Sequence, residues 1–385
     1  MKRICFLADS IFSFGGVQRV TAVIAKQLAK EYDVTIVTMD PPSARDTSLY
    51  GLEEADLHYR FFSYPDTPAW KNVLCKCYSA LYRKVLPQTP YTSNLYAHSS
   101  FPSEKRDALT AELRQGHYDV IIGDHAPLSV RLAACKPGLS GTRLIGWIHN
   151  SYQALFGPDS LYIGPELKKH YEFQLAKLDR TIVLCRYDQQ QYHFPTQVVY
   201  NPLTLVPGPA AEGNSKKFLA VGRFSHRHKG FDLLIEAFHH FAQKDKEWTL
   251  DIVGEGPEEA LYRTLIADFG LEQRIRLHPF TNNIQQYYHD AQVYVLSSRW
   301  EGFGLVIVEA MAHGLPVISS DLPTSKEIMG DFGLYFKNGD AAELALRLEE
   351  ATRMDWPTTS AEAIRRAEAF NIEHIIKKWK EMIEQ

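Results

Sequence analysis

One stretch in the last third of this 385-residue chain restricts the fold more than any other. Residues 293–296 form an apolar run typical of a buried strand, and a Gly-Phe-Gly turn follows. Residues 305–313 predict a short helix that a glycine and a proline end, and residues 317–320 predict a second strand. Strand, turn, helix and strand in this order predict a parallel sheet.

A carboxylate lies inside this predicted helix. The other residues of the helix are almost all apolar, so we expect it to be buried, and Glu309 is its only carboxylate. Because an ionised carboxylate in a core needs hydrogen-bond partners, a polar group must meet it. Either Glu309 pairs with a buried arginine and the glycines only turn the chain, or the site binds a ligand. Free N–H groups at a positive helix N-terminus suit a ligand with hydroxyls and phosphates, such as a sugar nucleotide.

A second carboxylate extends this pattern. Glu301 precedes the glycine turn, with seven residues between it and Glu309. The whole string resembles the E-x7-E signature of retaining glycosyltransferases of family 4. The resemblance implies that Glu301 contacts the hydroxyls of the donor sugar, as a catalytic residue, and that Glu309 accepts hydrogen bonds from the ribose. It also implies that the backbone of four residues binds the donor: Gly302, Phe303, Gly304 and Leu305.

A basic loop follows another apolar run in the second half of the chain. It begins at Gly222 with Arg223 and ends at Lys229, before a predicted helix. Cations at a strand-to-helix connection can hold a diphosphate by charge-assisted hydrogen bonds, although most basic loops are only solvated. The spacing resembles the diphosphate clamp of the same family, which implies catalytic roles for Arg223 and Lys229 and a donor-binding role for Gly222. Three further residues of the loop receive no role: His226, Arg227 and His228.

Two later positions are assigned by resemblance alone. Pro279 and Phe280 follow the strand predicted at 275–278, where relatives hold the nucleobase. After the strand at 317–320, family members often carry a Gly-Gly-x-x-Glu pattern. This chain lacks those glycines and keeps Glu327.

The N-terminal half begins with a second strand-turn-helix-strand unit. The apolar run at 4–8 precedes Gly15-Gly16, a helical period covers 17–30, and a strand follows at 34–39. A glycine pair before a helix usually only turns the chain, but it can also let an anion or a hydroxyl approach the backbone. The resemblance places this loop opposite the donor phosphates and assigns Gly16 to donor binding.

Polar residues end two further predicted strands. His149 follows the strand at 143–148, and Asp124 and His125 follow the strand at 119–123. Such residues lie where open α/β sheets bind ligands, unless they are only solvated strand ends. Family members commonly carry a histidine facing the transferred sugar or the acceptor at the position of His149, which implies a catalytic role. We rank Asp124 and His125 second.

These patterns predict an α/β protein of two Rossmann-like, parallel-sheet domains. A stretch rich in proline, glycine, alanine and asparagine at 203–215 is typical of a linker. The resemblance implies the GT-B fold, in which the two domains face each other across a cleft. We expect residues 1–203 to form the acceptor-side domain together with a crossing helix at 371–385. Residues 204–370 are expected to bind the nucleotide sugar.

Net charge, cysteine content and the length of apolar runs indicate which classes of protein this chain can belong to. A net charge of −4 gives no indication of a nucleic-acid partner. Five cysteines without metal-binding spacing predict reduced thiols in a cytoplasm. The chain has no apolar run of about 18 residues and no signal-peptide pattern, so we expect a soluble or peripheral enzyme. A DxD metal-binding motif is also absent, and we expect metal-independent chemistry without a cofactor.

Residues 41–106 have the least regular pattern. Aromatic and basic residues are interspersed here, from Tyr64 and Trp70 to Tyr96. One interpretation is an ordinary pair of helices with an aromatic inner face. The other is a segment that binds the acceptor or rests on a membrane, because aromatic and basic side chains suit a lipid interface.

The resemblance implies a retaining transferase that moves a hexose from a nucleotide sugar, most often a UDP-sugar, to a saccharide or lipid-linked acceptor in bacterial surface polysaccharide synthesis. The clamp would stabilise the charge on the leaving diphosphate, and the acceptor would attack from the face that the diphosphate leaves. Double displacement through Glu301 is the competing route. Three other functions remain open: a nucleotide-sugar epimerase of the same fold, a synthase with a small soluble acceptor, and a non-catalytic sugar-nucleotide sensor.

Overall fold

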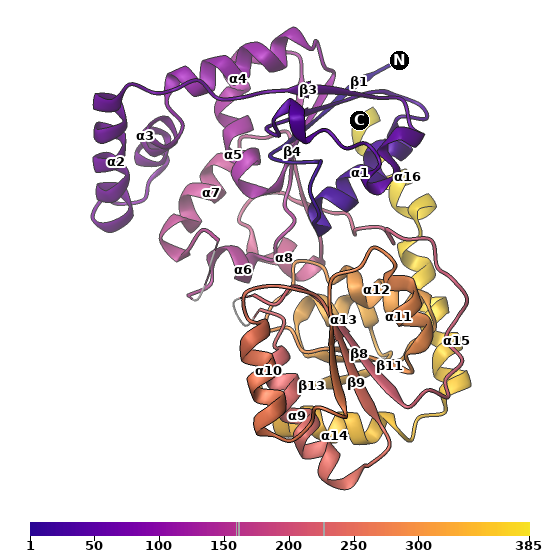
Figure 1. Cartoon of the computed structure of the whole chain (residues 1–385). Coiled ribbons are helices and arrows are strands. Elements are labelled where there is room, and N and C mark those ends of the chain that lie inside the picture. Colours follow the sequence, from indigo (N-terminus) through magenta and orange to yellow (C-terminus); the bar gives the residue numbers. More distant parts are fainter. Residues whose placement is uncertain (159, 161, 226–227) are drawn as a thin grey trace. The chain divides into compact units, whose positions relative to one another are not determined.

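The computed structural model describes residues 1–385 except Asp159, Leu161, His226 and Arg227. The chain divides into two compact units (Figure 1). Unit 1 comprises Met1–Pro202 and Glu373–Gln385, and unit 2 comprises Leu203–Ile372. Each unit contains one sheet whose strand pairs are all parallel, which confirms the prediction of two α/β, Rossmann-like domains.

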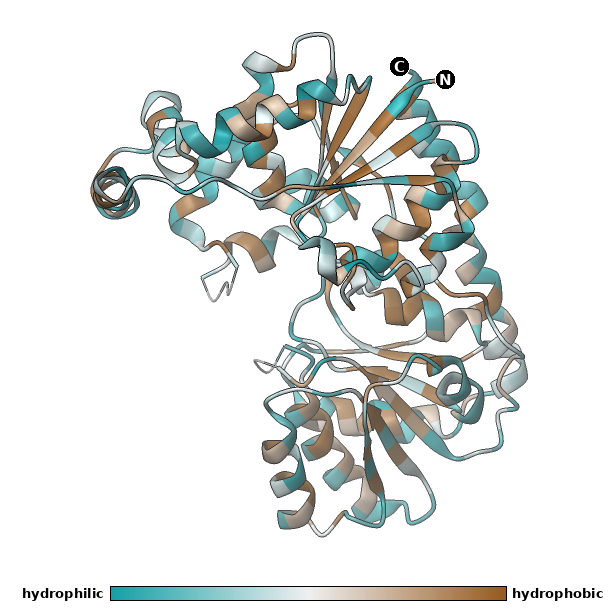
Figure 2. Ribbon diagram, turned by 45° about the horizontal axis from the view of Figure 1, so that its top comes forward, coloured by the Kyte–Doolittle hydropathy of each residue, from teal (hydrophilic) through white to brown (hydrophobic). Residues whose placement is uncertain are grey.

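The sheet of unit 1 has seven strands in the order β3-β2-β1-β4-β5-β6-β7. The inner strand β1 pairs with β2 on one side and β4 on the other, and Ile4 to Ala8 within β1 are completely buried. Figure 2 shows the apolar character of these strands as brown ribbon. The strand bounds are β1 Arg3–Ala8, β2 Asp33–Thr38, β3 Leu57–Phe61, β4 Val120–Asp124, β5 Arg143–Trp147, β6 Arg180–Val183 and β7 Gln197–Val198.

Helices connect these strands, and one helix comes from the end of the chain. The helices of unit 1 are α1 Gly16–Leu28, α2 Ala69–Lys84, α3 Pro90–Ser100, α4 Ser103–Gln115, α5 His125–Cys135, α6 Tyr152–Phe156, α7 Lys168–Leu175, α8 Arg186–Gln191 and α16 Ile372–Glu384. Helix α16 packs on the sheet through Trp379, which is completely buried against Phe6 and Trp147.

Unit 2 has a six-stranded sheet in the order β10-β9-β8-β11-β12-β13. Its strands are β8 Lys217–Val221, β9 Thr249–Val253, β10 Ile275–His278, β11 Val293–Leu296, β12 Val317–Ser320 and β13 Leu334–Phe336. Its helices are α9 Phe231–Lys244, α10 Glu259–Asp268, α11 Ile284–Asp290, α12 Leu305–Ala312, α13 Pro323–Met329, α14 Ala341–Ala351 and α15 Trp356–Ala367. The whole of β11 is buried, as its apolar sequence predicts.

The sequence shows no periodic pattern that predicts three elements of unit 2: α11, α13 and β13. Each is short, and β13 has only three residues. In the region of α2 and α3, the structure contains a pair of helices, which agrees with the first of the two interpretations of residues 41–106 and leaves the second one untested. No helix in the part of the chain that the structure describes is long and apolar enough to cross a bilayer.

Candidate functional site

The candidate residues of unit 2 gather at the carboxyl edge of its sheet. Strands β8 and β11 are neighbours, and their chains continue to opposite sides of the sheet, to β9 and β12. This is the topological switch point, where open α/β sheets bind ligands. The loop after β8 carries Gly222, Arg223 and Lys229, and the loop after β11 carries Glu301 and the glycine turn.

Lys229 and Glu301 meet directly. The Lys229 ammonium lies 2.6 Å from Glu301 Oε1, and the Ser298 hydroxyl donates to the same oxygen at 2.6 Å. Glu301 is 7% exposed, and no described residue bonds its other oxygen, Oε2. The pair therefore holds one carboxylate oxygen and leaves the second to accept a hydrogen bond from a ligand.

The groups around Glu301 determine its protonation state. Burial alone would raise the pKa of Glu301, but the charges of Lys229 and His228 and the hydrogen bonds from Lys229 and Ser298 outweigh it and lower the pKa. Burial also lowers the pKa of His228, whose ring stacks on Trp300 at 4.8 Å. At neutral pH Glu301 is therefore ionised.

The two loops are locked together by backbone contacts. Gly230 has a φ of 62°, and a Cβ there would lie 2.1 Å from the carbonyl oxygen of Ser297. Only glycine permits this approach. The Ser297 hydroxyl donates to the carbonyl of Lys229 at 2.7 Å, and the N–H of Arg299 donates to the carbonyl of His228 at 2.8 Å.

Arg223 differs from Lys229 in its surroundings. Its side chain is exposed and makes no hydrogen bond or ion pair with any described residue. Gly222, just before it, lies under the Lys229 stem, since a Cβ at Gly222 would lie 2.8 Å from Lys229 Cγ. His226 and Arg227 of the same loop lie outside the described residues.

Glu309 is buried in helix α12, at 2% exposure, as predicted. Hydroxyl groups meet its two oxygens: Tyr288 donates to Oε2 at 2.9 Å, and Thr204 donates to Oε1 at 3.4 Å. His313, whose pKa burial lowers, stacks on Tyr288 at 5.0 Å and its Nδ1 bonds the carbonyl of Glu309 at 2.8 Å. The polar partners that the sequence requires are thus present.

The N-terminus of α12 has no side-chain cap. Gly304 precedes the helix with a φ of 88°, a left-handed conformation that favours glycine, and as a glycine it supplies no side-chain cap. Leu305 begins the helix, while Phe303 is buried against Phe370. N–H groups and the helix dipole can therefore meet an anion here, with Gly302 at the entrance to the turn.

Pro279 and Phe280 follow β10 and are exposed. The N–H of Gly254 donates to the carbonyl of His278 at 2.9 Å, so the loops after β9 and β10 lie together at the same sheet edge as the residues above. Phe280 presents 45% of its surface to solvent.

In unit 1, His149 lies at the end of β5 and bonds a buried partner. His149 Nε2 lies 2.5 Å from Asp124 Oδ1, and the Thr21 hydroxyl donates to Oδ2 at 2.7 Å. Both members of the pair are nearly inaccessible. The carboxylate of β4 therefore fixes the orientation of the imidazole.

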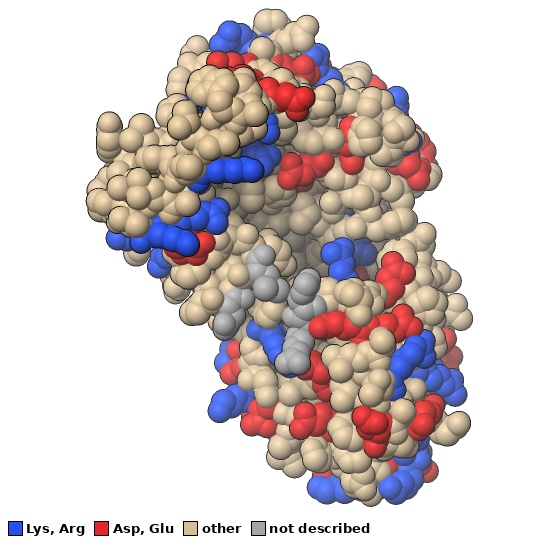
Figure 3. All heavy atoms as spheres, turned by 60° about the vertical axis from the view of Figure 1, so that its left-hand side comes forward, with Lys and Arg blue, Asp and Glu red and all other residues tan. Residues whose placement is uncertain are grey.

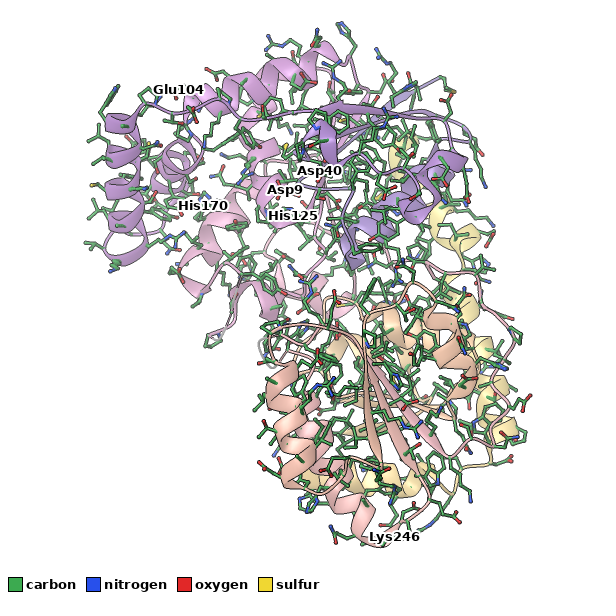
Figure 4. All side chains as sticks on the ribbon, in the orientation of Figure 1. Asp9, Asp40, Glu104, His125, His170 and Lys246 are labelled. Atoms are coloured by element: carbon green, nitrogen blue, oxygen red, sulfur yellow. The ribbon has the colours of Figure 1, made fainter. Side chains whose placement is uncertain are left out.

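A second acid–imidazole pair lies next to it at the same sheet edge. His125 Nε2 lies 2.8 Å from Asp9 Oδ2, between the ends of β4 and β1, as Figure 4 shows. His125 has a φ of 61°, which is uncommon for a residue other than glycine.

Gly16 is the first residue of helix α1 and is exposed. The N–H of the preceding residue, Gly15, donates to the Tyr50 hydroxyl at 2.9 Å.

Several residues of these sites carry no signal in the sequence. Ser298, Tyr288 and Thr204 bond the two glutamates, although hydroxyl residues are common throughout the chain. Asp124, which has the lower rank in the sequence analysis, is the direct partner of His149. Among the described residues, no group of three or more His, Cys, Asp or Glu side chains is arranged to hold a metal ion.

Two family models match the chain. The model described as Glycosyltransferase Family 4 spans residues 14–208, and the model described as Glycosyl transferases group 1 spans residues 206–369. An uncharacterized glycosyltransferase of Haemophilus influenzae is 26% identical over 99% of both chains. The lipopolysaccharide 1,6-galactosyltransferase of Salmonella typhimurium is 31% identical, over 32% of this chain and 36% of its own.

Solved structures share the fold over the full length. The Anabaena protein HepE in complex with UDP has a TM-score of 0.72 at 20% identity and covers all of both chains. Sucrose-phosphate synthase of Thermosynechococcus elongatus has a TM-score of 0.74 at 20% identity, over 100% of this chain and 99% of its own. The two Rossmann-like units are those of the GT-B fold. With one family model covering half of the chain and a second covering most of the rest, the protein is a glycosyltransferase, and the chain belongs to glycosyltransferase family 4.

Proposed function

We propose that the enzyme transfers a hexose from a UDP-sugar to a saccharide or lipid-linked saccharide, with retention of anomeric configuration and without a metal. The observation that carries this proposal is the Lys229–Glu301 pair at the switch point of unit 2, beside an uncapped helix N-terminus. A cation, a buried carboxylate and free N–H groups together suit a ligand that has both a diphosphate and sugar hydroxyls.

The leaving group of this reaction is a nucleoside diphosphate, and its growing negative charge needs stabilisation. Arg223 and Lys229 supply two cations, and the N–H groups from Gly304 to Leu305 supply dipoles. Glu301 holds Lys229 through Oε1 and offers Oε2 to a hydroxyl of the donor sugar. Glu309, set by Tyr288 and Thr204, accepts hydrogen bonds from the ribose.

Retention is proposed to arise by attack from the face that the diphosphate leaves, with the diphosphate taking the proton of the acceptor. His149, oriented by Asp124, faces the transferred sugar or the acceptor, and Gly16 contributes backbone to donor binding. Double displacement would require Glu301 as nucleophile. The ion pair to Lys229 lowers the nucleophilicity of that carboxylate, which favours front-face attack.

UDP is proposed as the carrier because structural neighbours are described in complex with UDP, and one with UDP-glucose. Bacterial surface polysaccharide synthesis is proposed because several partial relatives are named for lipopolysaccharide or colanic acid synthesis. We place the reaction in the cytoplasm, where the free thiols of the chain stay reduced. A synthase with a small soluble acceptor is the second candidate, because sucrose-phosphate synthase shares the fold.

The first test is a thermal-shift screen of UDP, GDP and ADP, followed by UDP-sugars, because a ligand of the folded state raises the melting temperature. UDP should give the largest shift among the nucleotides. The donor found in this way then serves for turnover measurements. Arg223→Ala and Lys229→Ala should each lower kcat by about 10²-fold or more, in line with the loss of one charge-stabilising donor.

The surface variant Arg263→Ala serves as the control, because Arg263 is an exposed residue of helix α10 that pairs with Glu259 one turn away. Its turnover should match the wild type. Near-normal turnover in both clamp variants would refute the assignment. Formation of an isomer from the nucleotide sugar alone would instead identify an epimerase.

A further inference from the structure

Helix α2 exposes an unusual amount of apolar surface. Trp70 is 66% exposed, and both Val73 and Leu74 are 60% exposed. Of the 16 residues of α2, only Tyr82 is buried. Single exposed apolar side chains are ordinary, but a cluster indicates a binding surface. Seven exposed large apolar side chains lie in α2, α3 and the turn between them: Trp70, Val73, Leu74, Leu81, Val85, Tyr91 and Leu95.

The exposed residues of α2 lie on one side of the helix. Trp70, Val73, Leu74 and Leu81 stand at positions i, i+3, i+4 and i+11, which a period of 3.6 residues brings to one face. We call these four residues the α2 stripe. An amphipathic helix normally turns such a stripe toward its own core, whereas here the stripe faces away from it.

The opposite side of α2 is firmly attached to unit 1. Tyr82 stacks on Tyr96 of α3 with ring centroids 4.5 Å apart. Lys71 pairs with Glu104 at 2.7 Å, and Arg83 donates to the Tyr96 hydroxyl at 3.1 Å. The orientation of the helix is thus set by contacts of its inner side, which hold the stripe outward.

The charged residues of α2 itself are all basic, and two of them pair with acidic residues of other segments, Lys71 with Glu104 and Arg83 with Glu166. No acidic residue occurs between Asp66 and Glu104. Lys76 and Lys84 of α2 are exposed and form no ion pair with any residue that the structure describes. Figure 1 places α2 at the outer side of unit 1, away from its sheet. In Figure 3, which brings this side forward, tan surface covers the outlying part of the unit, and blue side chains with a red group among them lie at its margin.

We propose that the α2 stripe docks on an anionic lipid bilayer, with α2 lying in the plane of the interface. The stripe would enter the boundary between headgroups and acyl chains, where tryptophan is favoured, while Lys76 and Lys84 contact anionic headgroups. A second copy of the chain is a less favourable partner for the α2 stripe. A symmetric interface would bring Lys76 and Lys84 of two copies close together, without acidic residues of α2 to balance their charge. The inference is independent of the proposed function, because lipid binding requires no donor sugar.

Vesicle flotation tests the proposal. The full chain should float with vesicles of phosphatidylcholine containing about one-third phosphatidylglycerol, and much less with phosphatidylcholine alone, since each basic residue near an anionic surface strengthens binding severalfold. The triple variant Trp70→Ser/Val73→Ser/Leu74→Ser should lose at least tenfold in vesicle affinity. Lys76→Glu/Lys84→Glu should also lose at least tenfold, and this loss should disappear as salt is raised.

Control variants and a melting-temperature measurement show whether a loss of vesicle binding comes from the substituted side chains or from misfolding. Leu346→Ser removes an exposed leucine of α14, and Lys30→Glu reverses an exposed lysine after α1; both should bind vesicles like the wild type. The triple variant should keep the melting temperature of the wild type, because its side chains are exposed. Equal wild-type binding to neutral and anionic vesicles, or full binding by the triple variant, would overturn the proposal.

Tryptophan fluorescence gives a second measurement. Trp70 is the only tryptophan among the exposed large apolar residues of the described chain. Brominated lipid should therefore quench part of the wild-type emission, and Trp70→Phe should remove that part. Light scattering without lipid should show no self-association that depends on the α2 stripe. A wild-type dimer that becomes monomeric in the triple variant would instead assign the stripe to a second copy of the chain.

Discussion

Two buried acid–base pairs lie at the carboxyl ends of parallel strands, one in each unit, and they differ in how firmly they are held. In unit 2, Lys229 reaches Glu301 on a long flexible stem, and Glu301 Oε2 has no bond from a described residue. In unit 1, Asp124 bonds His149 through one oxygen and Thr21 through the other. Unit 2 thus presents a cation and an acceptor that can rearrange around a ligand, whereas unit 1 presents an imidazole in one orientation.

Each unit also contains one charged residue that is largely buried and one that is more exposed. In unit 2, Lys229 is only 16% exposed, whereas Arg223 of the same loop is exposed. In unit 1, Asp124 is buried, whereas Asp9 at the end of β1 is half exposed. Removing a buried charge leaves its partner without compensation in a medium of low dielectric constant, whereas removing an exposed charge does not. Each unit therefore contains an internal control for the stability effect of its own pair.

The largest stability effect is expected at Lys229. Lys229→Met keeps the stem that covers Gly222 but leaves Glu301 buried without its cation, which should lower the free energy of unfolding by about 3 kcal/mol or more. Arg223→Ala should change it by less than about 0.5 kcal/mol, because Arg223 is exposed. Urea denaturation of the two variants measures the difference.

A double variant sharpens this test. Lys229→Met/Glu301→Gln removes both charges, so it should regain most of the stability that Lys229→Met loses. Similar losses in Lys229→Met and Arg223→Ala would show that the buried pair carries no special weight.

A smaller effect is expected for Asp124→Asn. The amide can still accept from His149, but it loses the negative charge, and its NH₂ group meets the Thr21 hydroxyl that now donates to Oδ2. The expected cost is about 1 to 3 kcal/mol of unfolding free energy. Asp9→Asn, at a half-exposed carboxylate, should cost less than about 0.5 kcal/mol. Thermal unfolding of the two variants under one condition compares them, and equal shifts in melting temperature would contradict the difference in burial.

Much of the fold could be predicted from the sequence because the strands carry continuous apolar runs. Residues 4–8 and 293–296 were expected as buried strands, and β1 and β11 contain them. Strand β13 was not predicted, since three residues are too few for any periodicity to appear. For the region of helix α2, the sequence leaves two interpretations open. It shows which residues are apolar but not which side of the helix packs on the rest of unit 1.

The site was predictable in its motif residues and not in their contacts. Glu301, Glu309, Arg223 and Lys229 stand in spacings that carry a signal, and their donor-binding roles stay predictions. The pairing of Lys229 with Glu301 joins residues 72 positions apart, so only the fold brings them together. Nor does spacing indicate that Asp124 holds His149, because the partnership depends on β4 and β5 being neighbours in the sheet.

The smallest expected effect is the pH dependence of the free energy of unfolding that Glu301 and Asp9 each contribute. Burial alone would raise the pKa of Glu301, but Lys229 and His228 outweigh it, so the pKa lies below the usual 4.5. The unfolded chain therefore takes up this proton at a higher pH than the folded chain does. The stabilisation from the ionised Glu301 is complete above about pH 4.5 and is lost as the pH falls through the folded pKa, at about 1.4 kcal/mol for each unit between the two pKa values.

Glu301→Gln removes this titration, so the stability gap between wild type and Glu301→Gln should narrow as the pH is lowered from about 6 toward 3.5. The pKa of Asp9 is also lowered, because the hydrogen bond and charge of His125 and the charge of Arg131 outweigh its burial. Asp9→Asn should therefore show a change of the same sign but smaller, since water screens a half-exposed carboxylate. Urea denaturation at a series of pH values measures both gaps. A gap for Glu301→Gln that stays constant, or that widens toward acid, would mean that the folded protein does not hold Glu301 as the ionised partner of Lys229.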